Sequence, residues 1–117
     1  MREYKFKGKH LIAEYYNLDF NNLACCELVN RYILEGIELA GANCIGTMKK
    51  EFEPEGYTIV ALLLESHVSV HAYPEQKSMF IDAFTCGDKN PLIIHEYLMD
   101  KLNVKDFKVD LLERGNF

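Results

Sequence analysis

The sequence contains no apolar run of the roughly 20 residues that a membrane-spanning helix needs. Its longest apolar run, residues 59–64, has only the length of a β-strand. The N-terminus also lacks the apolar segment that is typical of a secretory signal peptide. We therefore expect neither membrane insertion nor secretion.

Paired cysteine motifs are absent as well. The four cysteines stand at positions 25, 26, 44 and 86, and none of them forms a C-x-x-C pair. This spacing disfavours both a zinc site and a disulfide framework. A chain without disulfides fits a reducing compartment, so we expect a cytoplasmic protein without a metal site.

Basic residues are in the minority, with 13 Lys and Arg against 18 Asp and Glu and a net charge of −5. Nucleic-acid binding normally needs a clustered basic surface, so we do not expect a nucleic-acid partner. The chain of 117 residues, 49% of them hydrophobic, is long enough for one modest core. We expect a single domain that spans residues 1–117.

Hydrophobic periodicity and turn residues predict six strands and two helices. The expected strands cover residues 10–18, 43–52, 57–64, 68–73, 78–86 and 104–112, and the expected helices cover residues 19–40 and 91–102. Gly41 occupies a helix C-cap position, and Asn90 precedes Pro91 as an N-cap would. Short connections between strands predict an α+β two-layer sandwich, a mainly antiparallel sheet with two helices on one face.

Two helices on one face would leave the other face of the sheet uncovered. The nearly continuous apolar character of residues 59–64 disfavours exposure of that face to water. Packing of this face against a second copy of the chain would bury it. The sequence therefore predicts a homodimer.

Nucleophilic and titratable side chains concentrate in one stretch of the sequence. It reads Glu65-Ser66-His67-Val68-Ser69-Val70-His71-Ala72-Tyr73-Pro74-Glu75 and is followed by Phe84-Thr85-Cys86-Gly87-Asp88. A serine hydrolase is disfavoured because no Gly-x-Ser-x-Gly turn surrounds Ser66. One metal ion is also disfavoured, because His67 and His71 share a strand face about 13 Å apart. Taken singly, each of these residues is most simply a polar strand residue.

The combination of spacings, however, resembles the prokaryotic S-adenosylmethionine decarboxylase family, the short self-processing pyruvoyl enzymes of polyamine synthesis. The matching motifs are Glu65-Ser66-His67-(x)3-His71-(x)2-Pro74-Glu75, Asp82-(x)-Phe84-Thr85-Cys86-Gly87, residues 10–16 and Phe52-(x)-Pro54-(x)-Gly56. The likeness extends to residues 113–115 and so covers almost the whole chain.

The resemblance implies that the chain cleaves itself between Glu65 and Ser66. The serine hydroxyl attacks the preceding carbonyl to give an ester, and loss of the serine α-proton then eliminates that ester. Hydrolysis of the resulting dehydroalanine leaves a pyruvoyl group at position 66. The products would be a β chain, 1–65, and an α chain, 66–117.

The resemblance also implies roles for three further residues. His71 matches a processing histidine, and a neutral imidazole is a suitable base for the elimination. Thr58 stands where the family often has a serine whose hydroxyl assists processing. Strand parity puts Ser66 and His71 on opposite faces, so we expect the chain to bend at the cleavage site.

Cys86 matches the family's proton donor, and a thiol is largely protonated at neutral pH. The pyruvoyl carbonyl forms a Schiff base with the substrate amine and delocalises the carbanion left by decarboxylation.

For the substrate, the resemblance implies that Phe52 lies against the adenine and that Glu75 binds the ribose hydroxyls. Tyr73 replaces the tryptophan of many members. Residues 48–51 and 76–80 depart from the family pattern, and the same machinery decarboxylates arginine or ornithine in paralogues. We therefore expect S-adenosylmethionine as substrate, with arginine or ornithine as the alternative and a non-catalytic dimeric relative as a weaker one.

Overall fold

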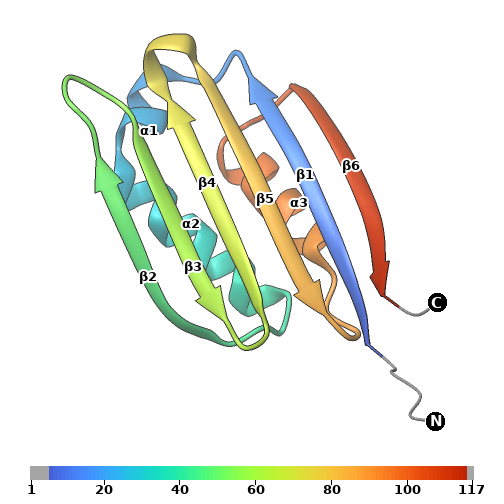
Figure 1. Cartoon of the computed structure of the whole chain (residues 1–117). Coiled ribbons are helices and arrows are strands. Elements are labelled where there is room, and N and C mark those ends of the chain that lie inside the picture. Colours follow the sequence, from blue (N-terminus) through green and yellow to red (C-terminus); the bar gives the residue numbers. More distant parts are fainter. Residues whose placement is uncertain (1–5, 116–117) are drawn as a thin grey trace, which may run out of the picture.

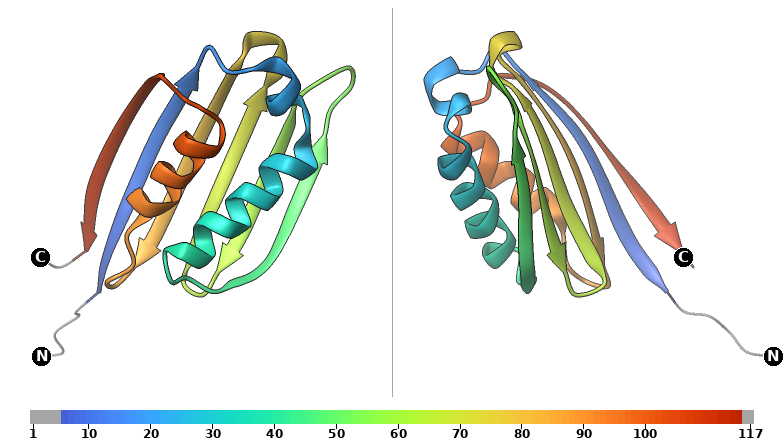
Figure 2. Two further views of the ribbon diagram at one scale, coloured as in Figure 1. Left: turned by 180° about the vertical axis from the view of Figure 1, so that it is seen from behind. Right: turned by 60° about the vertical axis from the view of Figure 1, so that its left-hand side comes forward.

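The computed structural model describes residues 6–115. Within these residues, six strands form one sheet, and helices cover one of its faces (Figures 1 and 2). In chain order the elements are β1 (Lys7–Tyr16), α1 (Phe20–Ala24), α2 (Cys26–Leu39), β2 (Cys44–Glu51), β3 (Tyr57–Leu63), β4 (Ser66–Tyr73), the 3-10 turn η1 (Pro74–Gln76), β5 (Ser78–Cys86), α3 (Pro91–Lys101) and β6 (Asp106–Gly115). The predicted α+β two-layer sandwich is confirmed.

The strand order in the sheet is β2-β3-β4-β5-β1-β6, and every neighbouring pair is antiparallel. Strands β2 to β5 form a meander in which each strand pairs with the next. The N-terminal strand β1 then lies between β5 and β6 (Figure 1). As a result, the N-terminal strand lies directly beside β5, and the C-terminal strand follows it at the edge of the sheet.

The predicted single helix over residues 19–40 is two helices, α1 and α2, so the helices of the described chain number three. The break falls at Cys25, whose backbone is extended with φ −87° and ψ 93°. The Tyr57 hydroxyl donates to the Leu23 carbonyl at 2.6 Å and so takes an acceptor that a continuous helix would use internally. Burial raises the pKa of Tyr57 far above its ordinary value, so this hydroxyl keeps its proton. Cys25 is exposed at this break, and Cys26, the first residue of α2, is buried.

The two predicted helix caps are confirmed. Gly41 directly follows Ala40, the C-cap residue of α2, and has φ 78°, a left-handed conformation in which glycine avoids the steric penalty of a β-carbon. The Asn90 side chain accepts from the Leu92 amide at 3.0 Å and caps α3.

The first and last strands along the chain, β1 and β6, differ in their bounds from the prediction. The strand expected over residues 10–18 is β1, which begins at Lys7 and ends at Tyr16. The strand expected over residues 104–112 is β6, which runs from Asp106 to Gly115. The two strands pair along their full lengths, and backbone pairing therefore continues through polar residues that hydrophobic periodicity does not mark. β6 lies at an edge of the sheet.

The core lies between the sheet and the helices. Strand β4 shows the alternation: Val68, Val70 and Ala72 are at most 1% exposed and face the helices. The intervening residues of β4 face the opposite side of the sheet, as predicted from strand parity. No helix in residues 6–115 is long and apolar enough to cross a membrane.

We call this opposite side the open face, because no helix covers it (Figure 2). By strand parity its exposed apolar side chains are Ile12, Met48, Val60, Leu62, Tyr73, Phe80 and Leu112. An apolar hollow of about 580 Å³ between β2 and β3 belongs to this region and is lined by Met48, Val60 and Leu62. Exposed apolar side chains such as those of Met48, Val60 and Leu62, which adjoin one another on β2 and β3, are typical of an interaction site.

Candidate active site

The predicted cleavage site lies in the tight turn between β3 and β4. Leu64 and Glu65 form the turn, and Leu63 pairs with Ser66 across it. Glu65 has φ 62°, a left-handed conformation that costs a residue with a β-carbon about 1 kcal/mol. The chain therefore turns at Leu64 and Glu65, directly before the predicted scissile bond. Ser66 itself stays in register with buried Leu63 and so remains on the strand face opposite to His71.

Ser66, Glu65 and Cys86 meet at this end of the sheet. The Ser66 Oγ accepts a hydrogen bond from the Cys86 amide at 3.2 Å. The Cys86 thiol donates to the Glu65 carbonyl oxygen, with 2.8 Å between Sγ and O. The same cysteine thus holds both the hydroxyl and the carbonyl that the resemblance implies will react. All three residues line a cleft of about 290 Å³.

Thr58 and His71 form a second pair, on the open face. They lie opposite each other on β3 and β4, and 3.0 Å separates Thr58 Oγ1 from His71 Nδ1. This contact orients the imidazole and leaves its Nε2 free of the threonine. A serine hydroxyl at position 58 could make the same contact, so threonine is chemically adequate there.

The three residues expected to bind substrate lie near this pair rather than near Ser66. Phe52 follows β2, and its amide donates to the Gly56 carbonyl at 2.8 Å. Tyr73 ends β4 and makes an edge-to-face contact with Phe80, with ring centroids 5.7 Å apart. Glu75 lies in the exposed turn η1. Phe52 also lines a cleft of about 340 Å³ together with Pro74.

The predicted site residues therefore form two groups at opposite ends of the β3–β4 hairpin. Ser66 and His71 are five residues apart on one strand, which corresponds to about 16 Å. Within a single copy, His71 cannot contact Ser66 or Cys86. The structure brings Ser66 together with Cys86 and His71 together with Thr58, but it does not unite the two pairs.

A polar network that the sequence did not predict lies on the open face. It links His10 on β1, Asp82 on β5, Arg114 on β6 and His67 on β4. His10 Nε2 lies 2.5 Å from Asp82 Oδ1, and His67 Nε2 lies 3.6 Å from the same oxygen. Strand parity places His67 and Asp82 on the open face, but their proximity depends on strand pairings that parity does not reveal.

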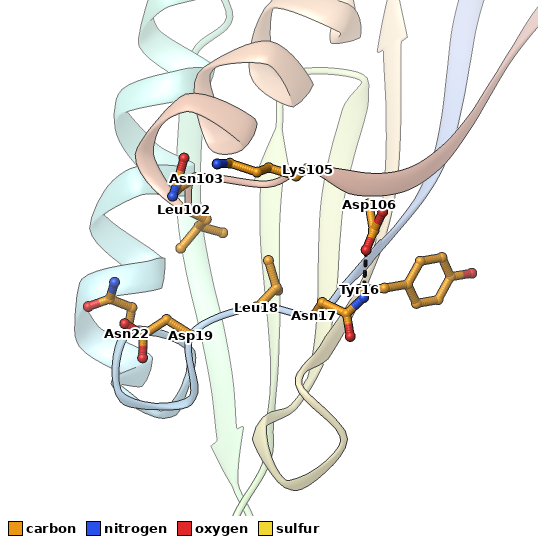
Figure 3. Close-up of a pocket in the computed structure, with 9 residues that line it drawn as sticks. All are labelled: Tyr16, Asn17, Leu18, Asp19, Asn22, Leu102, Asn103, Lys105 and Asp106. Atoms are coloured by element: carbon orange, nitrogen blue, oxygen red, sulfur yellow. Dashed lines mark hydrogen bonds between the residues drawn. The ribbon is translucent and has the colours of Figure 1, made fainter.

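A polar cleft of about 450 Å³ lies near the end of β1 and the start of β6 (Figure 3). Its lining includes Leu18, Asn103 and Lys105, and one side is closed by a 2.5 Å hydrogen bond from Asn17 to Asp106. None of the predicted site residues lines it. Among residues 6–115, no group of three or more His, Cys, Asp or Glu side chains is arranged to hold a metal ion.

Comparison with known proteins identifies the family. The family described as S-adenosylmethionine decarboxylase matches residues 9–115. This chain belongs to that family. The S-adenosylmethionine decarboxylase proenzyme 2 of Bacillus anthracis is 36% identical over 114 residues, which are 97% of this chain and 93% of the relative. The proenzyme of Archaeoglobus fulgidus is 33% identical over 109 residues, 92% of this chain and 97% of the relative.

Solved structures confirm the family fold. The crystal structure of the adenosylmethionine decarboxylase of Aquifex aeolicus VF5 is similar with a TM-score of 0.86 and 28% identity, and the match covers 97% of this chain and 95% of that one. A Trypanosoma brucei AdoMetDC monomer shares the fold with a TM-score of 0.64 at 19% identity, over 86% of this chain and 44% of that one. The family predicted from the motifs is therefore confirmed.

Proposed function

We propose that this chain is a self-processing, pyruvoyl-dependent decarboxylase that acts on S-adenosylmethionine. The observation that carries the proposal is the meeting of the Ser66 hydroxyl, the Glu65 carbonyl and Cys86 in one cleft. The family relatives are named proenzymes, which accords with activation by cleavage of a precursor.

Processing begins with attack of Ser66 Oγ on the Glu65 carbonyl carbon. The Cys86 thiol, which donates to the carbonyl oxygen, stabilises the negative charge that develops there. Transfer of the acyl group from nitrogen to oxygen gives an ester. Removal of the Ser66 α-proton then breaks the Oγ–Cβ bond, so the serine oxygen remains with Glu65 as part of a new carboxylate. The dehydroalanine left at position 66 reacts with water and releases ammonia.

The residues at this site fit the pyruvoyl group that such processing produces. Ser66 supplies all its carbon atoms, and the cleft beside Ser66 leaves room for a substrate amine. When present, the group supplies an electron sink for the decarboxylation. Cys86 lies beside position 66, where its thiol can deliver a proton to the substrate carbon.

We further propose that two copies pack through their open faces. Contact with a second copy would bury the exposed apolar side chains of β3, such as Leu62 at 55% exposure. A two-fold axis near the middle of β4 would place His71 and Thr58 of one copy over Cys86 and over the end of β4 that carries Ser66 in the other copy. The proposed homodimer thus accounts for the distance of about 16 Å between Ser66 and His71 within one copy.

In such a dimer, the expected substrate residues Phe52, Tyr73 and Glu75 would approach Ser66 of the opposite copy together with His71. Aromatic side chains and a carboxylate are suited to an adenine ring and ribose hydroxyls. The relatives named above are S-adenosylmethionine decarboxylases, so the arginine or ornithine alternative is not favoured. The four cysteines are free thiols, which supports a reducing, cytoplasmic location.

The decisive experiment is denaturing mass spectrometry of the purified protein after incubation. The wild-type chain should separate into fragments 1–65 and 66–117, the second with a pyruvoyl terminus, whereas Ser66→Ala should stay intact. Carbon dioxide release should then be measured separately with S-adenosylmethionine, arginine and ornithine, and we expect it with the first. A wild-type chain that remains uncut, or cut protein that decarboxylates only arginine or ornithine, would contradict the proposal.

A further inference from the structure

The polar network on the open face lies at the same end of the sheet as the cleavage site. His67 directly follows Ser66, and its ring packs on Phe84 with centroids 6.3 Å apart. Phe84 lies directly opposite both His67 and His10 in the pairings of β5 with β4 and β1. Three strands thus present adjoining side chains at His67, the residue that follows Ser66.

The hydrogen bonds of the network fix how it holds Asp82. Arg114 Nη1 lies 2.9 Å from His10 Nδ1, and because a guanidinium can only donate, Nδ1 is the acceptor. The proton of neutral His10 is therefore on Nε2, which donates to Asp82 Oδ1 at 2.5 Å. This chain of contacts orients the Asp82 carboxylate toward His67, whose Nε2 is 3.6 Å away.

The following step rests on the processing chemistry proposed above. In the precursor, Ser66 is held by the covalent turn and by the hydrogen bond from the Cys86 amide to Oγ. Cleavage removes both, because the Glu65–Ser66 bond is broken and Oγ remains with Glu65. Position 66 then becomes the free end of β4. The nearest side chain that can fasten this end to the sheet is that of His67.

We propose that His67 and Asp82 are positioning residues that hold the pyruvoyl-bearing end of the α chain after cleavage. His10 and Arg114 support them by orienting the carboxylate. In the precursor the network contributes little to the position of Ser66, because the covalent turn already holds that residue. Its function begins when the chain is cut, because the reactive carbonyl must then stay beside Cys86.

A kinetic comparison tests this proposal. His67→Phe keeps an aromatic ring against Phe84 but loses the contact with Asp82, and Asp82→Asn keeps the size of the side chain but loses its charge. We expect both variants to be cleaved within about threefold of the wild-type rate, while kcat falls about 10- to 100-fold because the reactive group is misplaced. KM should change far less than kcat. Asp100→Asn makes the same change in charge at an exposed position of α3, away from the open face; it is the matched control and should leave kcat unchanged.

Hydrogen exchange separates positioning from general stabilisation. In the processed enzyme, Asp82→Asn should accelerate amide exchange at residues 67–69 about tenfold, because a free strand end opens locally. In the uncleavable Ser66→Ala background the same substitution should change exchange at these amides by less than about twofold. A merely structural role would loosen β4 equally in both backgrounds.

The outcomes distinguish this inference from the proposed function. If the wild-type chain is cleaved and active but His67→Phe and Asp82→Asn retain wild-type kcat and exchange, the positioning role is wrong and the proposed function stands. Equal acceleration of exchange in the cleaved and uncleavable backgrounds would also overturn it. If the wild-type chain is never cleaved, both proposals fall.

Discussion

The Cys86 thiol donates a hydrogen bond to the backbone carbonyl of Glu65, with 2.8 Å between Sγ and O. One side chain on β5 therefore contacts the carbonyl that is attacked in the proposed processing. The same side chain is the one assigned to protonate the substrate during turnover. In the proposed mechanism Cys86 serves two successive reactions from one position.

Substitution of Cys86 should therefore affect processing and turnover unequally. In Cys86→Ala, loss of a hydrogen bond of about 1 kcal/mol to the carbonyl should slow cleavage about fivefold. Turnover should fall at least about 100-fold, because the proton donor is gone. Cleavage can be followed by denaturing mass spectrometry and turnover by carbon dioxide release. Cys25→Ala, which removes an exposed thiol at the break between α1 and α2, near the start of β3 and away from the turn, should change neither rate. Equal losses in the two reactions would contradict the double role.

The Thr58 hydroxyl orients His71 through the 3.0 Å contact with Nδ1. Thr58→Val removes that contact with little change in shape, and we expect cleavage to slow about tenfold, the equivalent of one hydrogen bond of about 1.4 kcal/mol. Thr58→Ser retains the hydroxyl and should be cleaved at close to the wild-type rate. Time courses of the two variants provide the measurement. Normal cleavage of Thr58→Val would show that the threonine does not orient the processing base.

Local sequence signals predicted much of this fold because they act over short distances. The alternation of Val68, Val70 and Ala72 determines which face of β4 is buried. The glycine after α2 and the asparagine before α3 determine where those helices end and begin. Each of these features depends on residues within a few positions of one another.

Features that depend on distant pairings were not predictable in this way. The helix break at Cys25 depends on Tyr57, which reaches the Leu23 carbonyl from another element. The 2.5 Å contact between His10 and Asp82 joins residues 72 positions apart and requires β1 to lie beside β5. Motif resemblance supplied the roles of the site residues, but only the structure shows that they form two separate groups.

His95 predicts a pH dependence of stability. It is 4% exposed, lies 2.6 Å from the Tyr15 hydroxyl through Nδ1, and burial lowers its pKa below the ordinary value, against a smaller opposing effect of Glu96. The folded protein thus favours neutral His95. The contribution of neutral His95 to the stability of the fold should be fully present above the unfolded pKa of about 6.5. It should decrease as the pH falls below that value toward the pKa of His95 in the folded protein.

Urea unfolding of the uncleavable Ser66→Ala chain at a series of pH values would measure this effect. At pH 8 the free energy of unfolding of His95→Phe should be about 1 to 2 kcal/mol lower than that of the parent chain, because the hydrogen bond to Tyr15 is lost. On acidification, it should decrease less than that of the parent chain. Tyr15→Phe removes the hydroxyl but leaves His95 buried, so it should keep the acid-dependent loss. An unchanged pH dependence in His95→Phe would show that other groups cause it.

The proposed dimer predicts that two defective chains restore each other. His71→Ala retains Ser66 but lacks the base, and Ser66→Ala retains His71 but cannot be cleaved. If His71 acts on the Ser66 of the opposite copy, co-expression should allow cleavage of about half of the His71→Ala chains, the statistical share of mixed dimers. Mass spectrometry distinguishes the two chains by a tag. Adding Leu62→Glu to both chains should abolish the restoration, because it places a charge on the open face. Failure of the mixed chains to be cleaved, in a preparation shown to contain mixed dimers, would mean that His71 does not act on the opposite copy.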